Sequence, residues 1–151
     1  MSTVTYSNPE VQKYISDHFI PIQMDTVQKP EMMDLFNATW TPSIIVHDAD
    51  EQEHRRMVGF YDPKKFLEEL ALARLKDALD NKDYPGAKNR VAEAMDLTKG
   101  DPDREPEALY WSAITDYKAS HNAEDLKSGW LKLLEQYPES EWAHRAEFIK
   151  Q

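Results

Sequence analysis

The chain contains no cysteine, and this absence excludes the chemistry that depends on a thiol. A thiolate is the nucleophile of thiol–disulfide exchange and the sulfur ligand of many metal sites. None of the 151 residues can supply one. A chain without disulfides also suits the cytoplasm, where thiols are kept reduced.

Glycine is scarce as well, with four residues, and no stretch has the spacing of a phosphate-binding loop or of a serine nucleophile elbow. No run approaches the ~20 apolar residues that a membrane helix needs. Met1–Tyr6 lack the basic and apolar parts of a signal peptide. We therefore expect a cytoplasmic protein with no cofactor and no membrane contact.

Acidic residues outnumber basic ones by 28 to 18, which gives a net charge of −10. The acidic residues are spread over both halves of the chain. Nucleic acids and anionic membranes attract clustered Lys and Arg. We therefore expect neither as a partner.

Two Glu-x-x-His stretches, Glu51 to His54 and Glu141 to His144, have the spacing found in di-iron helical bundles. The first falls in a predicted hairpin, where His47 and His54 are expected to face each other. The additional Glu ligands have no evident helices. We expect no metal site.

The first half of the chain alternates helices and strands. Asn8 and Pro9 are typical of a helix start, and Pro21 makes the following strand an edge or interrupted one because it lacks an N–H. The run Ile44-Ile45-Val46 favours a strand buried on both faces. We expect, in order, a helix from Asn8, a strand over 19–25, a short helix over 30–39, strands over 43–48 and 54–61, and a helix over 62–81.

The segment from Asp34 to Val46, with Trp40-Thr41-Pro42 between a short helix and an apolar strand, resembles the C-terminal part of a thioredoxin-like domain. The resemblance implies a cis peptide bond before Pro42 and an extended peptide held beside Thr41. Trp40 is then a peptide contact or packs under the helix. In the plainer alternative, Pro42 only shapes the turn into the strand.

From residue 82 the chain is expected to be helical throughout. The spacing of Ala87, Val91 and Ala94 returns at Leu126, Trp130 and Leu133, 39 residues later, and resembles tetratricopeptide repeats, whose period is about 34. Such repeats often bind peptides on a concave face. Tyr110, Trp111 and Trp130 are expected to line that groove or, alternatively, to pack between helices.

Together the halves resemble a bacterial family in which a thioredoxin-like domain runs into such helices. Members of this family begin with a strand and a Cys-x-x-Cys loop, both of which this chain lacks. In the family's sheet, that strand lies between the strands equivalent to 19–25 and 43–48. Three explanations are open: the chain is a shortened form of a longer protein, the flanking strands pair directly, or another copy or a partner supplies the strand.

The predicted fold is therefore α/β followed by all-α. Residues 1–81 are expected to be a thioredoxin-like domain with a three-strand sheet remnant, and residues 82–151 tetratricopeptide-like hairpins that share helix 62–81. The resemblance implies that Met1–Tyr6 are helical. Alternatively, these residues form a strand that covers the edge of strand 43–48, as their strand propensity allows.

The predicted function is a non-catalytic protein-interaction module. Its expected partner is a protein or peptide, or a second copy paired through the edge of strand 43–48. The alternative is a thiol–disulfide oxidoreductase whose Cys-x-x-Cys segment is absent from this chain.

Overall fold

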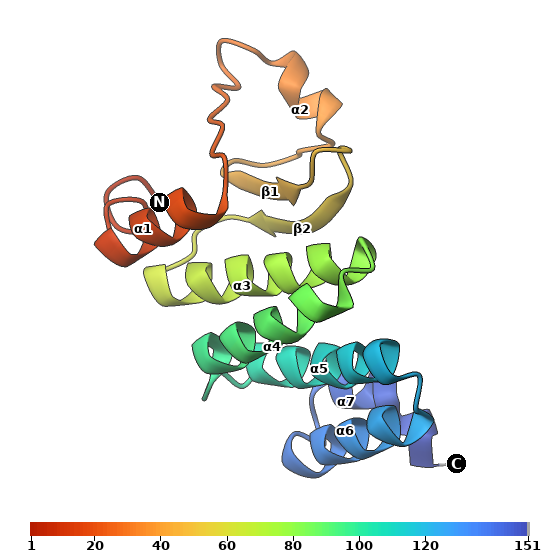
Figure 1. Ribbon diagram of the computed structural model, residues 1–151. Helices are drawn as coiled ribbons and strands as arrows, with labels where there is room; N and C mark the ends of the chain where they lie inside the picture. Colours follow the sequence, from red (N-terminus) through yellow and green to blue (C-terminus); the bar gives the residue numbers. More distant parts are fainter. Residues whose placement is uncertain (151) are drawn as a thin grey trace. The chain divides into compact units, whose positions relative to one another are not determined.

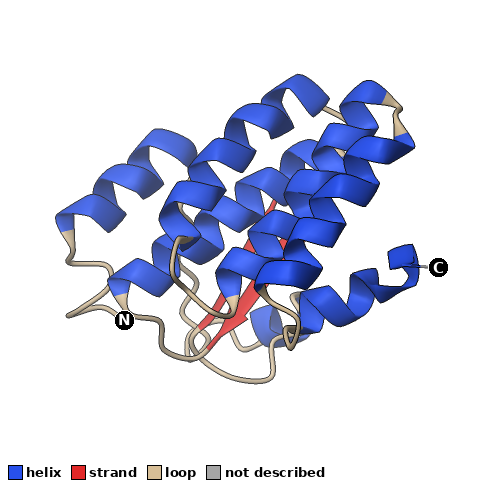
Figure 2. Ribbon diagram, turned by 90° about the horizontal axis from the view of Figure 1, so that it is seen from below, coloured by secondary structure: helices blue, strands red, loops and turns tan. Residues whose placement is uncertain are grey.

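The computed structural model describes residues 1–150 and is mixed but mostly helical. These residues form seven α-helices, one 3₁₀ helix and one sheet of two antiparallel strands (Figures 1 and 2). The chain divides into two compact units, Met1–Glu69 and Leu70–Gln151. The boundary falls inside helix α3 (Pro63–Asp80). Both strands belong to the first unit, so a mixed unit precedes a helical one.

Helix α1 (Pro9–His18) begins where the sequence predicts it. The Asn8 Oδ1 accepts hydrogen bonds from the backbone N–H groups of Glu10 (2.9 Å) and Val11 (3.2 Å), two of the donors that a helix start leaves unpaired. Pro9 fits the first turn because its position needs no N–H donor. Val11 is fully buried in the core of the first unit.

The residues before α1 fold as turns. Thr5 is fully buried, and its hydroxyl donates a hydrogen bond to the carbonyl oxygen of Tyr61. Tyr6 packs edge-on against Phe66 with 5.7 Å between ring centroids, and burial raises the pKa of its hydroxyl. The expectation that Met1–Tyr6 form a helix or a strand is wrong, because these residues pack instead against the chain around Tyr61 and Phe66.

The predicted strand over 19–25 is not formed, so the sheet has two strands rather than three. Pro21 cannot donate to a ladder, and no strand among residues 1–150 pairs with this segment. Ile20 and Ile22 are 91% and 72% exposed. Without a neighbouring strand, the apolar residues alone do not make the segment part of the sheet.

Helix α2 (Glu31–Leu35) is shorter than predicted, and Leu35 is exposed. The helix closes because Asn37 adopts a left-handed φ of 48° and the N–H of Ala38 bonds to the carbonyl oxygen of Met33 (2.7 Å). The Thr41–Pro42 peptide bond that follows is cis, as expected.

Strands β1 (Ser43–His47) and β2 (Glu53–Val58) form an antiparallel hairpin in which Ile44 lies opposite the fully buried Met57. The central residues of β1 are half-buried. Burial on both faces, which the apolar run predicts, is not reached. The hairpin therefore leaves β1 less enclosed than a central strand of a larger sheet.

The second unit continues α3 and adds four α-helices and a short 3₁₀ helix. Its helix starts are capped by side-chain oxygens: Asp83 accepts from the N–H of Gly86, Asn122 from that of Glu124 and Ser140 from that of Ala143. The elements are α4 (Tyr84–Thr98), α5 (Arg104–Ser120), α6 (Ala123–Gln136), α7 (Glu141–Ala146) and η1 (Glu147–Lys150).

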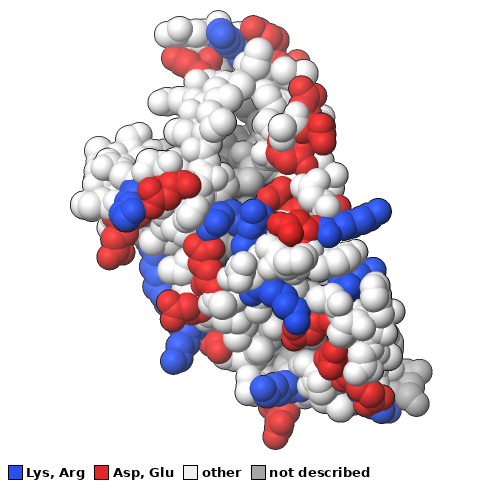
Figure 3. All heavy atoms as spheres, in the orientation of Figure 1, with Lys and Arg blue, Asp and Glu red and all other residues white. Residues whose placement is uncertain are grey.

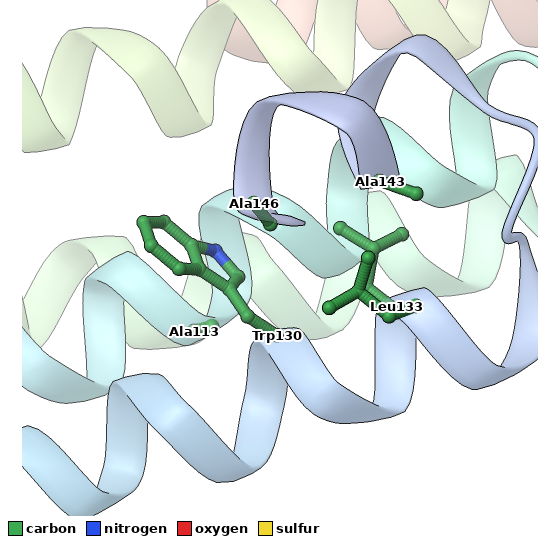
Figure 4. Packing of buried hydrophobic residues seen from close by; sticks show 6 residues of the cluster. Ala113, Trp130, Leu133, Ala143 and Ala146 are labelled. Carbon is green, nitrogen blue, oxygen red and sulfur yellow. The ribbon is translucent and has the colours of Figure 1, made fainter. Parts of the chain in front are cut away.

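A hydrophobic cluster among α5, α6 and α7 is built from small and large residues together (Figure 4). Ala113 and Ala146 lie around the side chains of Trp130 and Leu133. Gly129 allows α5 and α6 to approach closely, because a Cβ built at this glycine would lie 2.5 Å from the Cβ of Ala113. Small residues therefore set the spacing of these helices.

Candidate functional site

The loop Trp40-Thr41-Pro42 connects α2 to β1 and is the strongest candidate site from the sequence. The carbonyl oxygen of Pro42 accepts a hydrogen bond from the N–H of Gly59 (2.9 Å), which ties the loop to the end of β2. Gly59 takes a φ of +94°, a conformation that favours glycine. The Ser43 hydroxyl donates to the carbonyl oxygen of Trp40 (2.7 Å). The loop backbone is therefore anchored on the open end of the hairpin.

The side chain of Trp40 is 67% exposed. The alternative in which Trp40 packs under the preceding helix is therefore not observed. Thr41 and Pro42 are exposed as well. A tryptophan on an anchored loop offers a large apolar surface to a partner at little cost in side-chain entropy.

Strand β1 is paired on one edge only. Its partner is β2, and no other strand in residues 1–150 bonds to its second edge. An unpaired strand edge presents N–H and C=O groups that another extended chain can bond. Charged residues that protect such edges, Asp48 and Asp50, stand only at the C-terminal end of β1. The edge is therefore suited to strand addition.

Exposed apolar side chains gather in the first unit. In the upper part of the view in Figure 3, residues other than Lys, Arg, Asp and Glu cover most of the surface. The exposed large apolar residues of this unit are Val4, Tyr6, Ile20, Ile22, Met24, Val27, Leu35, Trp40, Val58 and Phe60.

The helical groove predicted from Tyr110, Trp111 and Trp130 is filled by these side chains themselves. Trp130 is 5% exposed and stacks on Tyr110 with 5.0 Å between ring centroids. The indole N–H of Trp130 donates to the carbonyl oxygen of Tyr110 (3.3 Å). Trp111 of α5 meets Trp142 of α7 edge-on, with 6.0 Å between ring centroids. The structure places the three residues in helix-to-helix packing, the alternative that the sequence left open.

His47 and His54 do not face each other across the hairpin. His47 lies opposite Glu53 and its ring stacks on Phe36, with centroids 6.2 Å apart. His54 is buried, and its Nε2 lies 3.1 Å from Oδ2 of Asp48. The irregular pairing between Val46 and His47 explains the difference, because a bulge shifts the facing of every residue after it.

Sequence reasoning missed one buried ionic contact in the first unit. Glu69 of α3 is 2% exposed, and its carboxylate accepts a hydrogen bond from Nε of Arg55 on β2. Its neighbour Glu68 is fully buried, and Nζ of Lys64 lies 3.4 Å from its carboxylate. Helical periodicity treats such residues as solvent-facing. The hydrogen bond from Arg55, which belongs to another element, pairs the buried carboxylate of Glu69 with a positive charge.

A second contact that sequence reasoning missed joins two loops of the helical unit. The Glu105 carboxylate accepts a hydrogen bond from the N–H of Gly100 (2.6 Å). Partial burial and a hydrogen bond to Glu105 raise the pKa of Tyr137 to about 12. These loops border an open depression of about 450 Å³, lined among others by Arg104 and Trp142. Glu105 therefore contacts both of the loops that border this depression.

Comparison with known proteins gives no match, whether with family models, with curated proteins or with solved structures. Within residues 1–150, every helix is too short or too polar to cross a membrane. The two family resemblances thus rest on the residues of this chain alone. Function has to be argued from the geometry of the site.

Proposed function

We propose that the chain is a non-catalytic, thioredoxin-like protein-interaction module that binds an extended segment of a partner protein by strand addition. The observation that supports this most is the edge of β1 that no described strand occupies, beside the exposed loop Trp40-Thr41-Pro42. A strand on this edge would bond to the backbone of β1. Trp40 would contact its side chains, and the tetratricopeptide-like helical unit would serve as scaffold.

The non-catalytic part of the proposal rests on the side chains available. Thiol–disulfide exchange needs a thiolate, and the 151 residues contain none. Around Pro42 the chain offers an indole, a hydroxyl and backbone groups, which suit binding. On this proposal, the chain reduces insulin disulfides no faster than a blank. A cytoplasmic location stays a prediction from the sequence.

The alternative is a thiol–disulfide oxidoreductase whose Cys-x-x-Cys segment lies outside these 151 residues. The thioredoxin-like resemblance is equally compatible with the interaction module and with the oxidoreductase. The gene sequence upstream of the Met1 codon distinguishes them. A strand-like run ending in Cys-x-x-Cys, in frame and without a stop, would support the oxidoreductase, and an in-frame stop close upstream would remove it.

Amide hydrogen exchange tests the interaction module. The probe is the neutral extended peptide Thr-Val-Thr-Val-Thr-Val-Thr, titrated into the full chain. We expect it to slow exchange at alternate amides of Ser43–His47 and to change tryptophan fluorescence. Trp40→Ala should weaken binding by about fivefold or more, as an interface aromatic does, without loss of stability because Trp40 is exposed.

Phe148→Ala is the matched control, since Phe148 of the helical unit is 58% exposed and lies outside the proposed site. It should leave binding unchanged. Unchanged exchange over Ser43–His47 at saturating peptide would contradict strand addition. The edge could also be occupied by a second copy of the chain, which sedimentation across a concentration series detects. If a dimer forms, protects these amides and prevents peptide binding, the edge belongs to the second copy.

A further inference from the structure

Arg56 lies in the middle of β2, opposite Ile45 of β1, and its guanidinium reaches the end of α2. Nη2 donates a hydrogen bond to the carbonyl oxygen of Phe36 (2.9 Å), and Nη1 donates a longer one to that of Asn37 (3.5 Å). The C-terminal end of a helix leaves carbonyl groups without a helical donor. Arg56 supplies two such donors from another element, and so connects α2 to the hairpin.

Glu53, at the start of β2, fixes the orientation of this guanidinium. Its Oε1 accepts a hydrogen bond from Nε of Arg56 (2.8 Å), and its Oε2 accepts one from Nη2 (2.5 Å). A carboxylate that accepts two parallel N–H bonds holds the planar guanidinium in one orientation. The contacts that run from Glu53 through Arg56 to the end of α2 together form the Arg56 bridge.

The Arg56 bridge holds one end of the segment that carries Trp40. At the other end, the carbonyl oxygen of Pro42 accepts a hydrogen bond from the N–H of Gly59 (2.9 Å). Between the two anchors lie four residues, Ala38–Thr41. A connection this short has little freedom once both of its ends are fixed. The place of Trp40 therefore depends on the bridge as well as on the contact of Pro42.

We propose that Arg56 is a positioning residue of the binding site, and that the Arg56 bridge holds Trp40 in the orientation that receives the partner. This inference rests on the proposed interaction function and adds a residue that acts through Trp40. Lysine does not replace arginine here. Its ammonium is a single point charge and lacks the planar fork that reaches a carboxylate and two carbonyl oxygens at once.

Loss of the bridge should affect Trp40 more than the strand edge. The pairing of β2 with β1 uses the backbone of Arg56, which a side-chain substitution leaves in place. Without the bridge, the segment before Pro42 gains conformations, and only a fraction of the molecules presents Trp40 correctly. The apparent affinity for a partner falls by that fraction. Strand addition along Ser43–His47 stays possible, but it is weaker.

The first measurement needs no ligand. Labelling the full chain with 5-fluorotryptophan gives one fluorine NMR signal for each of its four tryptophans, and Trp40→Phe assigns the signal of Trp40. In Arg56→Lys we expect this signal to move toward that of free 5-fluorotryptophan while the other three stay in place. Glu53→Gln should move it less, because Arg56 keeps its bonds to the carbonyl oxygens. Circular dichroism checks that both variants remain folded.

Arg145→Lys is the matched control, because Arg145 of the helical unit also forms an ion pair and lies beside a tryptophan. Its guanidinium carbon lies 4.5 Å from the ring centroid of Trp142. The same substitution there should move the signal of Trp142 and leave that of Trp40 unchanged. A movement of the Trp40 signal in both variants would make it a general effect of replacing an arginine, and would overturn the assignment to Arg56.

The second measurement is titration with the neutral peptide Thr-Val-Thr-Val-Thr-Val-Thr. We expect Arg56→Lys to bind it about 3- to 10-fold more weakly, as a competent fraction between about a third and a tenth gives. At saturating peptide, protection of the Ser43–His47 amides should remain. A double-mutant cycle with Trp40→Ala separates positioning from a general structural effect. Since Arg56 acts through Trp40, Arg56→Lys should cause little further loss once the indole is absent.

The outcomes separate this inference from the proposed function. An unchanged Trp40 signal in Arg56→Lys would overturn the positioning role, whether or not the peptide binds. Equal affinities of Arg56→Lys and the unaltered chain, or full additivity in the cycle, would overturn its part in binding and leave the interaction module standing. If the signal moves but the unaltered chain binds no peptide, the proposed function is overturned, while the dependence of Trp40 on Arg56 is supported.

Discussion

Replacement of Gly129 by alanine tests the closest helix contact of the second unit. The new Cβ would lie 2.5 Å from the Cβ of Ala113 on α5 and 3.2 Å from its Cα. Carbon atoms in van der Waals contact are about 3.5–4.0 Å apart. Helices α5 and α6 would therefore have to separate by about 1 Å, and the obstacle is partly backbone, which cannot turn away.

The expected cost follows from two opposing effects. Overpacking of a close contact costs about 1–3 kcal/mol, and the separation would also loosen Trp130 and Leu133, which are 5% and 0% exposed. Alanine is the better helix former by about 1 kcal/mol. We expect a net loss of about 1–2 kcal/mol in the free energy of unfolding, because the packing effect acts on several buried side chains at once.

Urea unfolding followed by circular dichroism measures this loss. The control is a double-mutant cycle with Ala113→Gly, which removes the Cβ that the new methyl group would meet. We expect Gly129→Ala to cost less in that background, since the 2.5 Å overlap is gone and only the contact to the Cα remains. A gain of about 1 kcal/mol in stability for Gly129→Ala alone, as helix propensity would give, would refute the close approach. Strict additivity in the cycle would refute it as well.

Two further predictions concern single contacts. Asn8→Ala should cost about 1 kcal/mol in the free energy of unfolding, because it leaves two N–H groups of α1 without their acceptor; Asn8→Ser should retain most of the stability, and equal urea midpoints for all three proteins would contradict the cap. The folded-state pKa of Tyr137 is raised to about 12, so its stabilising effect is complete below the ordinary tyrosine pKa near 10 and is lost as the pH rises through 12. Titration followed by ultraviolet absorbance should show a late-titrating hydroxyl that is missing in Tyr137→Phe and that titrates at lower pH in Glu105→Gln. A titration of Glu105→Gln identical to that of the unaltered chain would contradict the contact.

Local rules predicted the helix starts well. Asn8 was expected to begin a helix, and its side chain accepts a hydrogen bond from the N–H of Glu10. Asp62 and Ser140 act in the same way at the starts of α3 and α7. A cap depends on the residue and its immediate neighbours, which a sequence displays completely. The two hairpin strands and the long helix α3 were found for a similar reason, because their patterns of apolar residues are strong over their whole length.

The errors share a different cause. Whether residues 19–25 form a strand depends on a neighbour that supplies hydrogen bonds, and the segment's own residues carry no information about that neighbour. The same holds for Trp130, whose spacing fits either a groove or a core, and for Glu69, whose burial depends on Arg55 of β2. The candidate site was located by its sequence, but the exposure of Trp40 could be decided only by the structure.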